Sequence, residues 1–185
     1  MIYKLKITLL DHGPKIWRIV EVKSSIGLLE LHAVIQTAMG WTNSHLHHFI
    51  KNNVFYALPV EGSEDFEPEP IDESNVQAFD ILTKPDEKVI YEYDFGDGWE
   101  HEIELLKISD GKLKSPVCLQ GENACPPEDC GGVGGYEKLL EIITDPEHEE
   151  YEKTIEWLND DFDPSYFNLD ETNDEMKNYM DYCDW

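Results

Sequence analysis

Apolar and polar residues alternate along several stretches of the chain, as expected for strands that bury one face. The runs fall at residues 3–9, 16–22, 45–50, 54–58, 88–95 and 99–108. Turn-forming residues separate consecutive runs, among them Asp11-His12-Gly13-Pro14, Asn52-Asn53 and Gly96-Asp97-Gly98. Because runs of this kind joined by short Gly- or Asn-containing turns are typical of β-hairpins, the pattern predicts antiparallel hairpins.

Other segments repeat apolar residues every three or four positions, which predicts helices. The first runs from about Gly27 to Met39, with Ser25 as its cap and Gly40 placed to end it. Shorter helices are predicted at 76–82, 136–143, 146–158 and 176–182. Hairpins combined with a few helices predict an α+β fold, a single domain over residues 1–185 with a mainly antiparallel sheet flanked by helices. Residues 59–75 are predicted to be an exposed acidic loop, and 170–185 an acidic tail or short helix.

Charge is spread unevenly over the 185 residues, whose formal net charge is -26. Residues 1–60 carry six basic and three acidic side chains, whereas the following 125 residues carry 8 basic and 37 acidic ones. Nucleic-acid binding depends on clustered Lys and Arg, so this balance disfavours an unaided nucleic-acid binder and an anionic membrane surface alike. Most of the acid is interpreted as solvating surface.

The expected location is the cytoplasm. No segment approaches the ~20 apolar residues of a membrane span, and the N-terminus does not resemble a signal peptide. Four cysteines are too few for a disulfide scaffold of this length. The thiols are therefore expected to be free or to hold a metal ion.

Two groups of polar residues are candidates for chemistry at one site. His45 and His47 would share a face of a strand, and Asp94, Asp97 and His101 flank one tight turn. Imidazole and carboxylate groups can ligate a metal ion or transfer a proton. The structural alternative is that the histidines are surface or capping residues and that the aspartates only bond to turn amides.

A further candidate is a zinc site formed by Cys118, Cys125 and Cys130. Their separations differ from the paired Cys-x-x-Cys pattern of zinc knuckles. The fourth ligand would be His101, or a carboxylate such as Glu128 or Asp129. A Cys125–Cys130 disulfide and three small buried thiols are the alternatives. Zinc is thus the one cofactor that the sequence suggests.

Several motifs in order resemble the plasmid pRiA4b ORF-three-like family, small proteins of plasmids and of bacterial and archaeal genomes. The matching stretches include Ile16-Trp17-Arg18, His45-Leu46-His47, Tyr91-Glu92-Tyr93-Asp94-Phe95-Gly96-Asp97, Trp99-Glu100-His101, Cys125-Pro126-Pro127-Glu128-Asp129-Cys130-Gly131-Gly132 and Phe162-Asp163-Pro164. The resemblance implies a roll-like α+β domain and a link to mobile elements. It carries over no catalytic residue, and Arg18, the only arginine, argues against resolvase activity.

Two functions follow as hypotheses. The first is a non-enzymatic module that binds an unidentified protein or peptide through an aromatic surface. Its residues would be Trp17, Trp41, Tyr91, Tyr93 and Trp99. The second is a metal-dependent hydrolase that uses His45, His47, Asp94, Asp97 and His101, provided that their strands are neighbours.

Overall fold

The computed structural model describes residues 1–11, 15–59, 69–159 and 162–183. Eight strands form one sheet: β1 (Ile2–Leu9), β2 (Trp17–Lys23), β3 (His47–Lys51), β4 (Val54–Ala57), β5 (Ile71–Asp72), β6 (Lys88–Tyr93), β7 (Trp99–Ser109) and β8 (Val117–Glu122). The helical elements are α1 (Leu28–Met39), η1 (Glu73–Asn75), α2 (Ala78–Ile81), α3 (Gly132–Thr144), α4 (Tyr151–Trp157), α5 (Leu169–Glu175) and η2 (Met176–Cys183).

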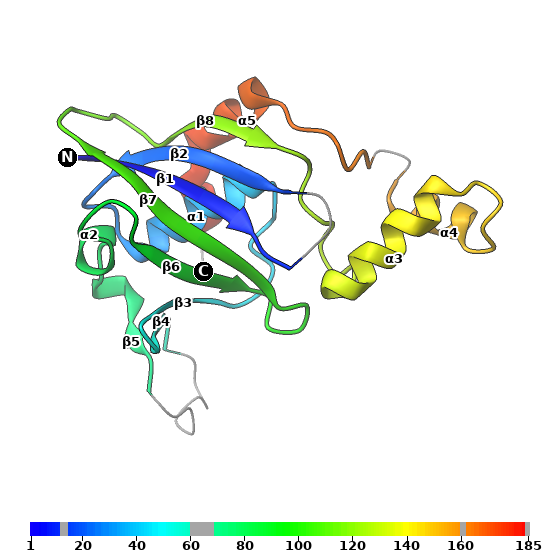
Figure 1. Cartoon of the computed structure of the whole chain (residues 1–185), viewed down its shortest axis with the longest axis horizontal. Helices are drawn as coiled ribbons and strands as arrows, with labels where there is room; N and C mark the ends of the chain where they lie inside the picture. The colour runs from blue at the N-terminus through cyan, green and yellow to red at the C-terminus, as the bar shows by residue number, and fades with distance from the viewer. Residues whose placement is uncertain (12–14, 60–68, 160–161, 184–185) are drawn as a thin grey trace.

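The strand order is β5-β4-β3-β6-β7-β1-β2-β8, and every pair is antiparallel except β4 with β5. Three hairpins build most of this sheet, and β7 pairs with β1 at its centre (Figure 1). Alternate residues of the central strands, such as Leu5 and Ile103, are fully buried. The predicted α+β class with a mainly antiparallel sheet is therefore confirmed.

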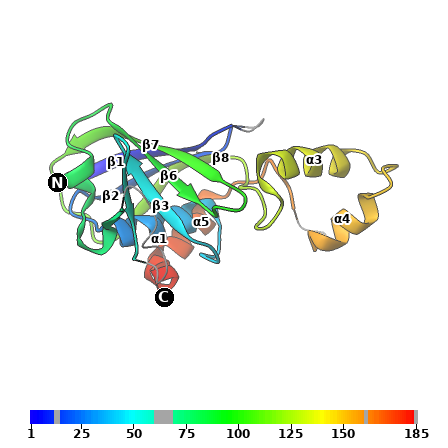
Figure 2. The same ribbon diagram turned by 90° about the horizontal axis from the view of Figure 1, so that it is seen from below.

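Helix α1 lies between the sheet and the C-terminal helices (Figure 2). Ten of its twelve residues are buried, because the sheet covers one side and η2 packs against another. It ends at Gly40, whose φ of 93° is the left-handed conformation that the sequence predicts for a helix stop. The predicted cap at Ser25 is wrong: Gly27 occupies the N-cap position and provides no side-chain hydrogen bond.

Three other local predictions need correction. Strand β8 forms inside the stretch 116–135, which was expected to be irregular. Strand β3 begins at His47, so His45 lies before the strand rather than in it. The acidic segment 59–75 includes β5 and η1 at its end, where Glu73 is fully buried. The remainder of that predicted loop at 60–68, and the turn residues 12–14, lie outside the described residues.

The C-terminal segment is helical and packs against the body of the fold. Met176 is buried against the core. The side-chain amide of Asn173 bridges to β8, donating to the carbonyl of Cys118 and accepting from its N–H, each at 2.9 Å. This segment is a structural layer that holds α1 and the outer strand.

Helices α3 and α4 lie beyond one end of the sheet (Figures 1 and 2). Tyr136 and Leu139 anchor α3 to the core, whereas α4 has no fully buried residue. Among the helices that the structure describes, none is long and apolar enough to cross a membrane.

Candidate metal centre

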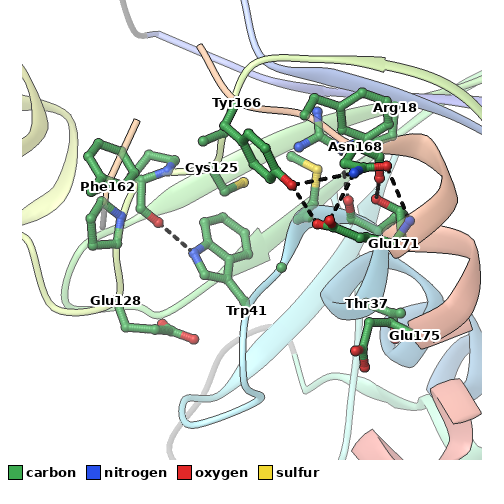
Figure 3. A pocket seen from close by; sticks show the side chains of 18 of the residues that line it. Arg18, Thr37, Trp41, Cys125, Glu128, Phe162, Tyr166, Asn168, Glu171 and Glu175 are labelled. Atoms are coloured by element: carbon green, nitrogen blue, oxygen red, sulfur yellow. Dashed lines mark hydrogen bonds between the residues drawn. The ribbon is translucent and has the colours of Figure 1, made fainter. Parts of the chain in front are cut away.

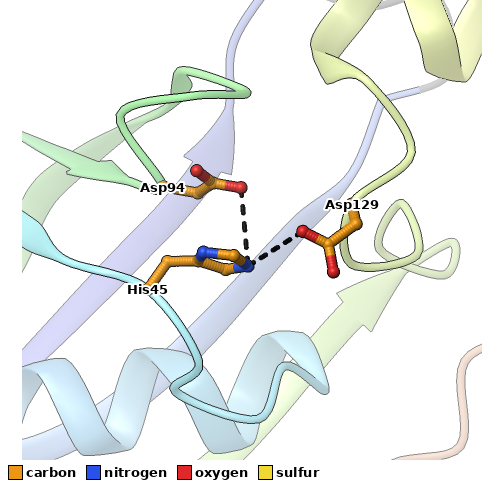
Figure 4. A group of neighbouring side chains, drawn as sticks. All are labelled: His45, Asp94 and Asp129. Atoms are coloured by element: carbon orange, nitrogen blue, oxygen red, sulfur yellow. Dashed lines mark ion pairs between the residues drawn. The ribbon is translucent and has the colours of Figure 1, made fainter.

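Three ligand atoms from three separate segments converge beside the β6–β7 turn (Figure 4). The Nε2 atom of His45 lies 3.7 Å from Oδ2 of Asp94 and 3.2 Å from Oδ1 of Asp129. Oε2 of Glu128 is 3.9 Å from the same nitrogen. In the described part of the chain, this is the one group of three or more His, Cys, Asp or Glu ligand atoms within 4.8 Å of one another.

Asp94 is placed by the tight turn that follows β6. Its φ of 56° is left-handed, a conformation in which Asp is enriched among non-glycine residues. Its Oδ1 accepts from the N–H of Gly96 at 2.9 Å, and its own N–H donates to the carbonyl of Leu46. One carboxylate oxygen therefore holds the turn, the backbone joins the turn to the His45 segment, and Oδ2 is directed to His45.

Glu128 and Asp129 are placed by a loop that is fastened at several points. The carbonyl of Pro126 accepts from Nε1 of Trp41 at 2.9 Å, and Oε1 of Glu128 accepts from the N–H of Thr42 at 2.9 Å. Oδ2 of Asp97 accepts from the N–H of Gly131 at 3.1 Å. These contacts fix both ends of the loop, which brings Asp129 to His45.

The donor set suits a divalent cation such as Zn²⁺ or Mn²⁺. Two ligands bonded at about 2.1 Å in a tetrahedral site lie about 3.4 Å apart, close to the observed separations of 3.2 and 3.7 Å. Nε2 of His45 and Oε2 of Glu128 are shielded from solvent and lack a hydrogen bond. Polar atoms buried in this way require a partner, and an ion would supply it. Three protein ligands leave further coordination positions open.

His47 does not join this centre, although the sequence predicts that it shares a face with His45. It points into the core, where its Nε2 is 3.0 Å from Oε1 of Glu73 and its ring stacks on His32. Burial lowers the pKa of His47 to about 3 and raises that of Glu73 to about 8. Both groups are thus driven to their neutral forms, because desolvation penalises the charged ones.

A buried polar network surrounds that pair between α1 and the sheet. His32 contacts the Tyr91 hydroxyl and Oδ1 of Asn43, each at 2.8 Å, and Gln36 donates to the Tyr91 hydroxyl at 3.0 Å. The helical spacing of His32 and Gln36 was a usable signal for this network, but their pairing with Tyr91 depends on the tertiary fold.

Asp97 and His101 are also outside the ligand set. Asp97 supports the loop through Gly131. His101 is fully buried in β7, with Nδ1 3.1 Å from the carbonyl of Trp99, and the ring of Trp41 packs edge-on against it. Of the five predicted polar residues, the structure brings only His45 and Asp94 together. The third member of the group is Asp129, which the sequence suggests as an alternative ligand beside the cysteines.

The three cysteines do not form the predicted four-ligand set with His101. Cys118, Cys125 and Cys130 are free thiols, and among the described ligand atoms no cluster of three includes them. Cys118 is buried in β8, while Cys125 and Cys130 pack against the hydrophobic core. Burial raises the pKa of Cys125 and of Cys130 to about 12, so both are protonated at neutral pH. Cys118 is thus a buried thiol and the other two are partly buried thiols at the edge of the core.

Most of the predicted aromatic surface lies in the core. Trp41, Tyr91, Tyr93 and Trp99 are almost completely buried, and Trp17 is half-buried. Trp41 packs between Tyr93, Trp99 and His101, beneath the candidate centre. The alternating aromatic pattern of β6 therefore reports the core face of a strand rather than an interface.

Comparison with known proteins identifies the family. The sequence profile described as "Plasmid pRiA4b ORF-3-like protein" matches residues 1–171. The chain belongs to the plasmid pRiA4b ORF-3-like family. The uncharacterized protein y4hQ of Sinorhizobium fredii (strain NBRC 101917 / NGR234) is 38% identical over 175 residues, which are 93% of this chain and 89% of that protein.

A solved structure shares the same fold. The crystal structure of MM3350, a protein of unknown function from Methanosarcina mazei Go1, matches with a TM-score of 0.80 and 36% sequence identity, covering 92% of this chain and 96% of that one. The two chains therefore share one fold, and MM3350 is described only as a protein of unknown function.

Proposed function

We propose that the protein binds a divalent metal ion through His45, Asp94 and Asp129 and uses it in a hydrolytic reaction. The observation that carries this proposal is the convergence of three ligand atoms within 4.8 Å from segments far apart in the sequence. A bound divalent ion lowers the pKa of a coordinated water to near neutrality, which is the chemistry that hydrolysis needs.

Glu128 is the candidate general base. Its Oε1 is held by the N–H of Thr42 and by the hydroxyl of Tyr93, at 2.9 and 3.1 Å. Its Oε2 has no hydrogen bond and lies 3.9 Å from Nε2 of His45. A carboxylate oriented by one oxygen, with the other directed at the ligand set, can accept a proton from a water molecule there.

The first alternative, a non-enzymatic binding module, loses its original support. It rested on an aromatic surface, and four of those five side chains are buried. A cytoplasmic location and a link to mobile elements remain predictions.

Metal content tests the first half of the proposal. Untagged protein purified without chelator is expected to contain Zn²⁺ or Mn²⁺, and the ion should raise the melting temperature of chelator-stripped protein. His45→Ala and Asp129→Asn should abolish both effects. His148→Ala and Asp110→Asn, which alter the same residue types outside the centre, should retain them. Metal-free protein whose melting temperature is unchanged by either ion would overturn the proposal.

Turnover tests the second half. Metal-loaded protein is assayed on p-nitrophenyl esters of phosphoric and carboxylic acids. Glu128→Gln, which keeps an oxygen to accept from Thr42, is expected to lower any hydrolysis rate by about 100-fold while metal binding persists. Equal rates for the two proteins would exclude Glu128 as the base.

A further inference from the structure

A cavity of about 790 Å³ is lined in part by Trp41. Its walls include the end of α1, the loop that carries Cys125 and Glu128, and residues of two C-terminal stretches, 157–159 and 162–175 (Figure 3). This volume is within the usual range of ligand-binding pockets, about 300–1,000 Å³.

Among the described residues that line the cavity, Arg18 is the one basic side chain, and it is committed to the fold. Arg18 is 3% exposed, and its guanidinium donates to the carbonyls of Ala38, Trp17, Glu122 and Asn123 at 2.8–2.9 Å. Phe167 covers it, with 4.4 Å between the guanidinium carbon and the ring centroid. Four of its five donors are therefore occupied by backbone oxygens, which leaves little capacity to bind an anionic ligand.

Three carboxylates also line the cavity, those of Glu128, Glu171 and Glu175. Glu171 is oriented by the hydroxyl of Tyr166 and by Nδ2 of Asn168, at 2.6 and 2.8 Å. The surrounding sequence strengthens this bias, because residues 145–185 carry 15 acidic and two basic side chains. The potential in the cavity favours a positively charged ligand.

Exposed aromatic side chains complete the wall. Trp157 and Tyr166 are 48% and 51% exposed, high values for large aromatic residues. Both line the cavity, together with Phe162 and Phe167. Aromatic faces next to carboxylates are the combination that binds guanidinium and ammonium groups, through cation–π contacts and ion pairs.

We infer that this cavity is a binding site for a basic peptide segment of a partner protein, which inserts arginine or lysine side chains between Trp157, Tyr166 and Glu175. The site goes beyond the proposed hydrolytic function and does not depend on it. It shares Glu128 with the candidate metal centre, so the binding experiment uses chelator-stripped protein and leaves Glu128 unchanged. A failure of peptide binding would then leave the metal proposal intact, and an absence of metal binding would leave the peptide-binding inference intact.

The test is calorimetric titration with a capped tri-arginine peptide at about 150 mM salt, where long-range surface attraction is screened. Glu175→Gln and Trp157→Ala are each expected to weaken binding about tenfold. Glu141→Gln on α3 and Phe79→Ala on α2 remove an exposed carboxylate and an exposed aromatic ring elsewhere. These two controls should change the affinity less than about twofold.

Three results would overturn the inference. If the cavity variants and their matched controls weakened peptide binding equally, the peptide would be attracted only by the overall charge of the protein. Equal binding of a tri-glutamate peptide would remove the charge argument. Equal or tighter binding of spermidine would identify a free polyamine, rather than a peptide, as the cation that the cavity takes. Melting temperatures of all four variants establish that each remains folded.

Discussion

The imidazole rings of His32 and His47 lie face to face in the core, with centroids 3.6 Å apart and planes within 5° of parallel. Such a stack disfavours two charged rings, because two adjacent imidazolium ions would repel each other. Burial accordingly lowers the pKa of His32 to about 2. Glu73, on the far side of His47, completes a chain of buried titratable groups that are neutral in the folded protein.

Replacing Glu73 by Gln should make the protein increasingly stable relative to wild type as the pH rises from 5 to 8. The pKa of Glu73 is raised from 4.5 to about 8, chiefly by burial and also by Asp72, while His48 opposes the shift. Between pH 4.5 and 8 the Glu73 carboxyl group therefore binds up to one more proton in the folded chain than in the unfolded chain. This group lowers the free energy of unfolding by up to about 1.4 kcal/mol for each pH unit of increase in that window.

Glu73→Gln replaces the carboxylic O–H donor by an amide N–H donor and cannot ionise, so its stability relative to wild type should rise from pH 5 to pH 8. Urea denaturation at the two values measures this difference, in which the titration of the histidines largely cancels. Glu141→Gln, at an exposed position, is the control. A constant difference between Glu73→Gln and wild type would show that Glu73 titrates normally.

Asp97 should act as a positioning residue for the candidate metal centre. Asp97→Ala removes the acceptor for the N–H of Gly131, two residues after Asp129. The expected result is a loss of about 1 kcal/mol of stability and a roughly tenfold weaker affinity for Zn²⁺. Asp97→Asn keeps an oxygen acceptor and should restore the affinity. Unchanged Zn²⁺ affinity in Asp97→Ala would show that the contact between Asp97 and Gly131 does not position the metal ligands.

Two glycines of α3 should respond in opposite ways to alanine. A Cβ at Gly132, where φ is +67°, would lie 2.5 Å from the carbonyl oxygen of Asp97, whereas one at Gly134 would meet nothing within 4 Å. Gly132→Ala is therefore expected to destabilise the fold by several kcal/mol, because it combines backbone strain with a steric clash. Gly134→Ala should stabilise it by up to about 1 kcal/mol. Thermal denaturation of the two variants gives the comparison.

Asn173 should contribute more to stability than its partial exposure suggests. Asn173→Ala removes both hydrogen bonds to the backbone of Cys118, and the expected cost is about 1–3 kcal/mol. Asn178→Ala, which alters an exposed residue of η2, is the matched control and should cost less than about 0.5 kcal/mol. Chemical denaturation measures both, and equal effects would contradict the role of Asn173.

The sheet was largely predictable, because alternation along β1, β2, β6 and β7 is strong and each hairpin turn carries a local signal. Strand β8 was not, because Gly121 and the neighbouring prolines and cysteines are typical of loops. Its strand conformation depends on pairing with β2 and on the C-terminal segment beside it.

The candidate centre was predicted only in part. The sequence indicates His45 and Asp94 as polar residues near turns. It also predicts that His45 and His47 share a strand face, but β3 begins only at His47, so the two histidines point to different places. Asp129 reaches His45 only because contacts to Trp41, Thr42 and Asp97 fasten its loop across the fold. Contacts between segments so distant in sequence leave no periodic signal in the chain.

The pairing of Asn173 with Cys118 also bears on how the molecule behaves at high concentration. Outer strands of open sheets are templates for another chain, since their unpaired backbone groups recruit a further strand. Here one outer strand, β5, has only two residues, and the other, β8, has a backbone donor and acceptor occupied by a side chain of its own molecule. Both lateral ends of the sheet are therefore poor starting points for fibrillar self-association.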